Sequence, residues 1–391
     1  MSPLRQGSVP RTWDVLIAGA GPAGSMAALV LARAGVRVRL VDRARFPRDK
    51  LCGDTVNPGS LAILDRAGLG GAVRARARPV RGMIVTGPGA RVAASYPGGV
   101  VGAALTRRDL DVLLVEAATT AGACFDAGVR VDGPVMSSDG RRVTGVRMTS
   151  GAREHTLRAR IVIAADGRGS RLASALGLSR FARAPRRWAF GTYFTDVEEL
   201  TDHGEMHIRT GAYLGVAPLP GGIANVCLVR GADGGRAAPH VDQTRVVREM
   251  LASDRMLRER FAGARQIADV TAIGPLAVDS GAAGRPGVLL AGDAGGFVDP
   301  MTGDGLRFAL RGGQLAGDAA LRELASGAPA DAALAAARRR EFQGKWRLNR
   351  ALRLLVGSPR AVEVAATVAR YWSAPVNYLV GAAGDIHLDG G

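Results

Sequence analysis

Residues 13–42 read WDVLIAGAGPAGSMAALVLARAGVRVRLVD and contain the pattern that decides the fold. Residues 13–18 form an apolar run typical of a buried strand, and residues 25–35 have a helix-forming composition that stops at Gly35. A second apolar run ends at Asp42. The segment therefore predicts a strand, a turn, a helix and a second strand, which is the repeating unit of a parallel sheet with helices on its faces.

The turn between this strand and this helix is rich in glycine. Gly19, Gly21 and Gly24 match the spacing G-x-G-x-x-G, in which glycines allow a tight turn, let a pyrophosphate approach the backbone and let the helix pack closely on the strand. The helix N-terminus then directs N–H groups and a partial positive charge at the phosphates. Asp42 follows Gly24 by 18 residues, where its carboxylate can accept hydrogen bonds from a ribose. The spacing predicts dinucleotide binding.

The bulk composition is that of a globular chain. With 391 residues, of which 47% are hydrophobic, the chain is long enough for two domains or for one large fold with insertions. Its formal charge of +17 comes almost entirely from arginine, because Lys50 and Lys345 are the only lysines. The arginines are spread through every segment instead of forming a basic stripe, so we expect no nucleic-acid partner.

Cysteine and histidine are both scarce. Cys52, Cys124 and Cys227 cannot form a complete set of disulfides and lack the spacing of a metal site, which favours a reducing cytoplasm. The first 13 residues lack an apolar stretch of signal-peptide length, and no run of about 18 apolar residues occurs, so we expect neither secretion nor a membrane span. His203 and His207 lie in a strand-like segment without a third ligand, so we expect no metal site.

The rest of the chain carries signals for both kinds of element. We expect strands near residues 83–86 and 91–95, a hairpin around SSDGRR, and helices over residues 58–67, 105–123, 170–176 and 246–261. Thr106 is placed to cap the second of these helices. From residue 332 onward the chain reads as arginine-rich helix, which Pro359 should divide in two.

Two further glycine-rich turns follow apolar strands later in the chain. They are ADGRGS, residues 165–170, and AGDAGGFVDPMTGDGL, residues 291–306. Buried strands and helices avoid glycine and proline, so a stretch rich in both is suited to bringing backbone against a ligand. Together with GAGPAG, residues 19–24, these turns resemble the FAD-dependent family that holds the aromatic-ring monooxygenases, the flavin halogenases and the geranylgeranyl reductases.

This resemblance covers the chain up to about residue 320 and implies an α/β fold with an α+β insertion. We expect a glutathione-reductase-like Rossmann FAD-binding domain, an inserted substrate domain whose β-sheet covers the flavin, and a C-terminal helical segment. The expected boundaries are residues 1–76, 98–180 and 280–330 for the FAD-binding domain, 77–97 and 181–279 for the substrate domain, and 331–391 for the C-terminal helices.

The family pattern also implies which residues hold the cofactor. The FAD-binding residues expected from it are Gly19, Gly21, Ala23, Gly24, Asp42, Arg43, Cys52, Arg107, Asp166 and Asp293. Arg107 would reach the phosphates, Asp293 the ribityl chain, and Pro300 the edge of the isoalloxazine ring. The backbone of residues 302–306 would lie against the flavin N1 and O2, where the helix that begins near Asp304 would stabilise the anionic reduced flavin.

Three reactions compete within the family. The loop FPRDKLCGD, residues 46–54, resembles the geranylgeranyl reductases, in which a Cys-Gly lies close to the flavin. The segment GAYLGVAPLP, residues 211–220, lacks the tryptophan of their lipid tunnel, and no tryptophan pair of the halogenase type is evident. We therefore expect first an NAD(P)H-driven monooxygenase that hydroxylates an aromatic or polyketide-like molecule through a C4a-hydroperoxyflavin. Second is a reductase of carbon–carbon double bonds in an isoprenoid, and third a halogenase.

Few side chains are candidates for a role in the chemistry. The resemblance places Cys52 beside the flavin and makes it the candidate catalytic residue. Arg48, Lys50, His207 and Tyr213 are candidates for orienting the substrate. The protein thus contributes mainly placement and access, because the cofactor carries the redox chemistry.

Two functions other than catalysis remain open. The protein could be a flavoprotein that only carries a ligand, or it could bind membrane surfaces or nucleic acid through its arginines. Residues 346–372 place leucines on one helix face and arginines on another, which favours packing on the FAD-binding domain over peripheral membrane contact. We expect an apolar small-molecule substrate and a monomer or homodimer.

Overall fold

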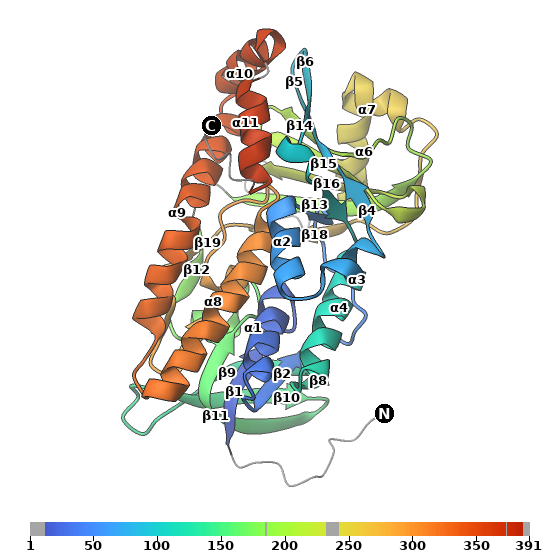
Figure 1. Ribbon diagram of the computed structural model, residues 1–391. Coiled ribbons are helices and arrows are strands. Elements are labelled where there is room, and N and C mark those ends of the chain that lie inside the picture. Colours follow the sequence, from blue (N-terminus) through green and yellow to red (C-terminus); the bar gives the residue numbers. More distant parts are fainter. Residues whose placement is uncertain (1–11, 184–185, 232–241, 373, 386–391) are drawn as a thin grey trace.

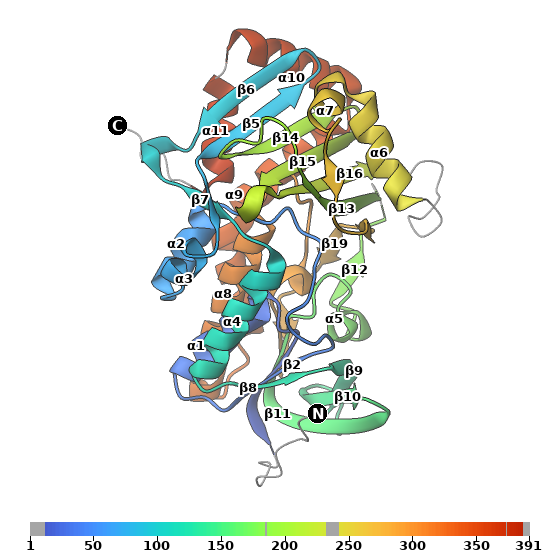
Figure 2. The ribbon, with the colours of Figure 1, turned by 90° about the vertical axis from the view of Figure 1, so that its right-hand side faces the viewer.

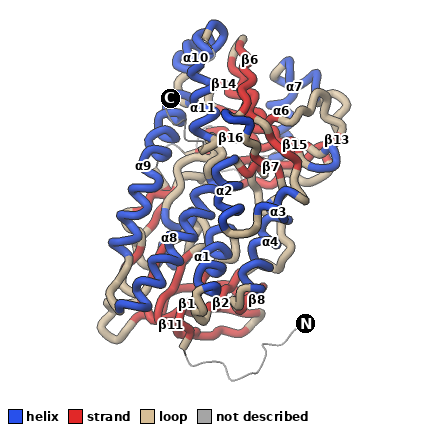
Figure 3. Tube along the Cα trace, viewed as in Figure 1, coloured by secondary structure: helices blue, strands red, loops and turns tan. Residues whose placement is uncertain are grey.

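The computed structural model describes residues 12–183, 186–231, 242–372 and 374–385 (Figure 1). The N-terminal stretch in which we expect no signal peptide lies outside these ranges, apart from its last two residues. Strands gather at two ends of the molecule, and long helices run between them (Figure 3).

The first sheet is built on the strand that precedes the first glycine-rich turn. Its order is β20-β21-β11-β1-β2-β8, in which β21, β11, β1, β2 and β8 are parallel and the hairpin β9-β10 continues from β11. The strands are β1 (Trp13–Ala18), β2 (Val38–Asp42), β8 (Cys124–Ala127), β9 (Val129–Met136), β10 (Val143–Ser150), β11 (Arg153–Ala164), β20 (Gly284–Arg285) and β21 (Val288–Leu290).

Both faces of this sheet are buried, as the continuous apolar run of β1 requires. Val15 and Ile17 pack into the helical layer, whereas Leu16 and Ala18 pack toward β9, β10 and the short helix α5 (Arg171–Ala175). The helical layer contains α1 (Pro22–Arg33), α4 (Arg107–Thr120) and α8 (Gly305–Ser326). A side chain at Gly313 of α8 would lie 2.3 Å from the Ala23 carbonyl oxygen, so glycine is required where α8 crosses α1.

The second sheet lies at the other end of the molecule (Figure 2). Its order is β17-β13-β16-β15-β14-β5-β6, with β18 beside β13. The strands are β5 (Gly82–Gly87), β6 (Ala90–Ser95), β13 (Arg187–Thr195), β14 (His203–Arg209), β15 (Ala212–Pro218), β16 (Ala224–Gly231), β17 (Arg265–Gln266) and β18 (Thr271–Ile273). Residues 82–95 thus join a sheet formed mainly by residues far later in the chain.

One face of the second sheet is covered by α6 (Gln243–Ser253) and α7 (Arg255–Arg260). The sequence predicts a single helix here, and that prediction is wrong at Asp254. The backbone of Asp254 is extended, and its side chain accepts a hydrogen bond from the Leu257 amide at 3.1 Å. An N-cap of this kind begins a new helix, so the break has a local cause.

Shorter elements join the two sheets. They are a three-stranded sheet of β3 (Thr55–Val56), β4 (Arg78–Val80) and β7 (Gly102–Ala104), the pair β12 (Ser179–Phe181) and β19 (Val278–Ser280), and the helices α2 (Pro58–Arg66) and α3 (Gly70–Arg74).

Three helices follow from residue 331 onward. Helix α9 (Asp331–Val356) runs from the first sheet toward the second, whereas α10 (Pro359–Tyr371) and α11 (Ala374–Ala383) lie beside the hairpin β5-β6 (Figure 1). As the sequence predicts, Pro359 begins a new helix, and Ser358 caps it. Across the described ranges, every helix is either too short or too polar to cross a bilayer.

Candidate active site

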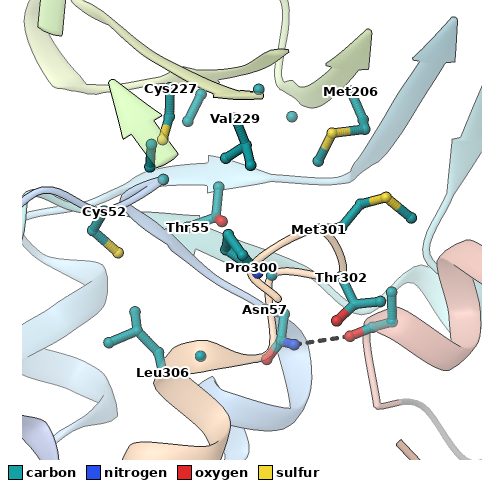
Figure 4. Close-up of a pocket in the computed structure, with 18 of the residues that line it drawn as sticks. Cys52, Thr55, Asn57, Met206, Cys227, Val229, Pro300, Met301, Thr302 and Leu306 are labelled. Atoms are coloured by element: carbon teal, nitrogen blue, oxygen red, sulfur yellow. Dashed lines mark hydrogen bonds between the residues drawn. The ribbon is translucent and has the colours of Figure 1, made fainter. Parts of the chain in front are cut away.

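A cavity of about 730 Å³ lies between the two sheets. All three glycine-rich turns line it, together with the loop of residues 42–57 and the inner face of the second sheet. Across this space, side chains from that sheet face side chains from the last turn (Figure 4), namely Met206, Cys227 and Val229 on one side and Pro300, Met301 and Thr302 on the other.

The first glycine-rich turn has the shape that the sequence predicts. A side chain at Gly19 would lie 2.4 Å from the Ala165 carbonyl oxygen, and one at Gly24 would lie 1.8 Å from the Gly19 carbonyl oxygen. Both approaches are therefore possible only for glycine. A side chain at Gly21 would instead point toward Arg48 and Arg107, with Nη2 atoms 3.7 and 3.9 Å away. Gly21 also precedes α1 without any side-chain cap, which leaves the N-terminal N–H groups of α1 available to an anion.

Acidic groups lie at the strand ends around this turn. Asp42 accepts hydrogen bonds from the Ala20 and Ala44 amides, both at 2.8 Å. Asp166 accepts from the Arg171 amide at 3.0 Å, but its Oδ1 atom is buried without a partner. Burial raises the pKa of Asp166. An unpartnered buried oxygen at the cavity wall indicates a site for a hydrogen-bond donor on a ligand.

Five basic side chains line the cavity, namely Arg43, Arg48, Lys50, Arg107 and Arg168. The last four lie near Asp111 or Asp293 and are called the basic cluster. Arg107 donates two hydrogen bonds of 2.8 Å to Asp111, and Arg48 approaches the same carboxylate at 3.0 Å. Asp111 is fully buried and fixes both guanidinium groups. Asp111 carries one negative charge and the two arginines carry two positive charges, so these three residues together keep a net positive charge. A net positive charge suits the binding of a pyrophosphate.

Asp293 lies beside this basic cluster, after β21. Burial raises the pKa of Asp293, while Lys50, Arg107 and Arg168 lower it in part. Desolvation in turn lowers the pKa of Lys50, as does the charge of Arg107. The Arg168 Nε atom is buried without a partner. Asp293 and the basic side chains beside it are therefore buried polar groups that a polar ligand could contact, and the Arg168 Nε atom has a free N–H for such a ligand.

The last glycine-rich turn is held from behind by helix α9. Asn349 donates to the Asp299 carbonyl oxygen at 3.0 Å and to Thr302 Oγ1 at 2.8 Å. Lys345 donates to Asp304 at 2.7 Å, and Arg338 donates to the Gly295 carbonyl oxygen at 2.7 Å. Sequence reasoning missed these three side chains. Their only signal was their polarity within a helix, which is equally typical of an exposed face.

The loop that carries Cys52 is held from the second sheet. Asp54, which is fully buried, accepts hydrogen bonds of 2.8 Å from both Tyr193 and Asn225. Asn225 also donates to the Cys52 carbonyl oxygen at 3.1 Å. Burial raises the pKa of Asp54 to about 7, although the Tyr193 hydroxyl and the Arg107 charge oppose this shift. Sequence reasoning missed this group, because its members are distant in sequence.

Cys52 itself lines the cavity (Figure 4). Burial raises the pKa of its thiol, and the neighbouring Arg107 lowers it only in part. The thiol therefore stays protonated at neutral pH, which makes it a poor nucleophile but a possible proton donor.

Two of the candidates for orienting a substrate are occupied elsewhere. The Tyr213 hydroxyl donates to Asp299 at 2.5 Å, so this tyrosine offers only its ring to the cavity. His207 is fully buried between Thr86 at 2.9 Å and Glu205 at 2.8 Å, so both ring nitrogens have partners. Arg48 and Lys50, which belong to the basic cluster, both line the cavity.

Beyond Cys52 and Pro300, the cavity becomes apolar. It continues between the hairpin β5-β6 and the two last helices, where mostly aliphatic side chains line it. They are Met83, Val85 and Val92 from the hairpin, Val362, Ala365, Ala366 and Ala369 from α10, and Val376, Leu379 and Val380 from α11. This part of the wall offers few groups that could bind a polar molecule.

The sequence-predicted cofactor residues thus come together at one site. Gly19, Gly21, Ala23, Asp42, Arg43, Cys52, Arg107, Asp166 and Asp293 line the cavity, and Gly24 packs just behind it. The glycine-only turn, the uncapped N-terminus of α1, the basic cluster and the unpartnered oxygen of Asp166 fit the pyrophosphate and polar groups of FAD. Gly303, with φ +69°, and Thr302 line the cavity before α8, where their backbone fits a flavin edge.

Comparisons with known proteins agree with this fit. The family described as "FAD binding domain" matches residues 12–334. The chain is 31% identical to a "Menaquinone reductase" of Mycobacterium tuberculosis over 80% of this chain and 77% of that protein. It is 29% identical to a "Digeranylgeranylglycerophospholipid reductase" of Methanosarcina mazei over 81% of this chain and 76% of that protein.

Among solved structures, a flavin-dependent brominase, Bmp2, has a similar fold, with a TM-score of 0.82. The alignment covers 95% of this chain and 94% of that chain at 19% identity, which shows a shared fold alone. The family match, the reductase relatives and the geometry of the cavity lead to one conclusion: the chain belongs to the FAD-binding family and is an FAD-dependent oxidoreductase.

Proposed function

We propose that this protein reduces carbon–carbon double bonds in the prenyl chain of an apolar, isoprenoid-bearing molecule. The observation that carries the proposal is the continuation of the cavity past Cys52 into a channel between β5-β6 and α10-α11. A prenyl chain is long, narrow and apolar, so a channel lined by aliphatic side chains stabilises it through the hydrophobic effect.

The relatives support the same reaction class. The names of the two reductases in the comparison refer to molecules that carry polyprenyl chains. Hydroxylation, which the sequence analysis placed first, has weaker support, because both relatives described above are named as reductases. Double-bond reduction, placed second, now becomes the main proposal. The missing tryptophan of residues 211–220 argues against a lipid tunnel of the usual composition, but α10 and α11 provide an apolar wall in its place.

The protein's own groups have distinct roles in this proposal. FAD, once reduced, would supply the hydride, and NADPH or NADH is the proposed source of the two electrons that reduce it. The aliphatic channel would hold the chain with one double bond near Cys52 and Pro300, and would exclude water from it. Cys52 would hold a proton at its Sγ atom for the second carbon of that double bond, because its raised pKa keeps the thiol protonated.

The reaction can be tested with a prenylated quinone and a short prenyl alcohol under argon, with NADPH or dithionite as reductant. Chain reduction predicts a two-dalton gain that survives later exposure to air. A gain that disappears in air would show reduction of the quinone ring, and incorporation of labelled oxygen in an aerobic sample would show hydroxylation. Either result would overturn the proposal.

Replacing Cys52 with alanine tests its role as proton donor. We expect bound FAD to be retained and the rate of product formation to fall by about 100-fold, within the range of general acid catalysis. Cys124→Ala is the matched control, since Cys124 is exposed and does not line the cavity. Equal rates for the two variants would remove Cys52 from the chemistry.

A further inference from the structure

The outer surface of α10 and of the turn that follows it exposes large apolar side chains. Val364 is 63% exposed, Tyr371 82% and Trp372 62%. Val364, Val368 and Tyr371 lie four and seven residues apart, so they share one face of the helix. We call this surface, with Trp372 and the exposed Tyr378 of α11, the apolar patch. Monomeric soluble proteins rarely expose such a set of neighbouring apolar groups without a function.

Helix α10 is apolar on its opposite face as well. Val362, Ala365, Ala366 and Ala369 point inward and line the channel. A helix that only covered a core would carry polar residues outside. On α10 the large apolar residues of the patch are exposed beside the polar residues Arg360, Glu363, Thr367 and Arg370. Figure 2 shows the helix beside the hairpin β5-β6 at the far end of the second sheet.

The surroundings of the apolar patch are basic. Between residues 342 and 384 the sequence has six basic residues and one acidic residue, Glu363. Arg347 and Arg350 of α9 and Arg360 of α10 are exposed. Arg370 is also exposed and donates two hydrogen bonds to the Gly89 carbonyl oxygen, which fixes the end of α10 to the β5-β6 turn. Aromatic and aliphatic groups beside arginine are typical of helices that lie in an anionic membrane interface.

We propose that the apolar patch docks on the surface of an anionic lipid bilayer. Tyr371 and Trp372 would enter the headgroup region, and the arginines would pair with lipid phosphates. Docking would place the part of the channel that Ala366 and Ala369 line next to the lipid, which would shorten the path of a prenyl chain through water. The identity of the prenyl-bearing molecule rests on the proposed function, whereas the docking is argued from the apolar patch alone.

A charged bilayer explains the patch better than a protein partner does. A second copy of this chain would place the same basic surface against itself, and like charges would oppose that contact. Helix α10 carries the apolar patch on one side and lines the channel on the other, which would have a use if the partner supplied an apolar molecule.

Vesicle flotation with the full-length protein loaded with FAD tests this proposal. We expect binding to vesicles that mix phosphatidylglycerol with phosphatidylcholine, and weaker binding to phosphatidylcholine alone or at high salt. The triple variant Val368→Ser, Tyr371→Ser, Trp372→Ser should weaken binding by at least about tenfold. The double variant Val100→Ser, Ile267→Ser is the matched control and should leave binding unchanged, because these side chains are 41% and 43% exposed but lie outside α10 and α11.

Other outcomes would overturn the docking proposal. These are the absence of vesicle binding, equal binding by the triple and control variants, or a dimer that the triple variant disrupts in sedimentation. Activity on a short prenyl alcohol separates this test from that of the proposed function. It should be the same in the triple variant and the native protein, since the three residues do not line the channel. If the native protein lacks that activity but still binds vesicles, only the proposed function fails.

Discussion

The two ends of the cavity are built on different principles. At the end near α1, the wall is formed mainly by backbone, because Gly19 and Gly24 allow backbone contacts that any side chain would block. At the end near α10, the wall is made of small aliphatic side chains, and their volume decides the shape. A backbone site tolerates almost no change of residue, whereas a side-chain channel can be altered gradually. We therefore expect substitutions at the first end to abolish cofactor binding and those at the second end to change substrate preference.

The largest effect is expected at Gly24. Its replacement by valine places a side chain against the Gly19 carbonyl oxygen, which is part of the turn itself. Stability should fall by about 3 kcal/mol or more, and the purified protein should lack FAD. Flavin absorbance per polypeptide and urea unfolding measure the two effects.

Gly71→Ala provides the control for that substitution. Gly71 lies in helix α3 with open space where a side chain would go. This variant should keep its FAD and its stability. A Gly24→Val protein that stayed yellow would show that the turn can rearrange, and the contrast between the two ends would weaken.

A smaller effect is expected where α9 supports the last glycine-rich turn. Asn349→Leu removes the donor to the Asp299 carbonyl oxygen and to Thr302 Oγ1, both inside the protein. A buried acceptor that loses its donor costs about 1–3 kcal/mol, and FAD affinity should fall with it. Gln343→Leu, at an exposed position of the same helix, should change neither quantity. Equal unfolding midpoints for both variants would contradict the supporting role of α9.

The contrast between the ends also explains what the sequence could predict. The turn at residues 19–24 could be identified because a backbone site leaves a fixed glycine spacing. The end of α1 before β2 could also be predicted, because Gly35 is a local stop signal. The supports of the site, Asn349 and the Asp54 group, could not be identified, because hydrogen bonds between distant segments leave no local pattern. The helix break at Asp254 was missed for a related reason, since an aspartate inside a helical pattern is equally typical of an exposed position.

Asp54 should give the protein a distinctive pH dependence. Its pKa is raised to about 7 by burial, above the unfolded value near 3.9. The folded protein therefore holds a proton that the unfolded chain releases, so its stability should fall as pH rises between about 4 and about 7. In the variant Asp54→Asn this loss should disappear, with a difference on the order of 2 kcal/mol between about pH 5 and about pH 8.

Asparagine is a suitable replacement at this position. Asp54 has φ +53°, a left-handed conformation that asparagine also tolerates. Urea unfolding of the FAD-free native and variant proteins at both pH values measures the effect. If the native protein gained stability with pH relative to Asp54→Asn, the hydrogen bonds from Tyr193 and Asn225 would outweigh burial, and Asp54 would be ionised throughout.

The smallest effect is expected at the far end of the channel, where it tests the comparison most directly. Ala369→Phe adds a ring to the wall of α10 without touching the flavin-facing turns. We expect kcat/KM to fall by about tenfold, or about 1.4 kcal/mol, for a long prenyl chain. Because a short prenyl alcohol does not reach α10, its kcat/KM and the FAD content should stay constant. Ala351→Phe, exposed on α9, controls for the added ring. If kcat/KM fell equally for both substrates, the added ring would act on the flavin end of the cavity. The apolar end would then not be a channel that selects substrates by the length of their prenyl chain.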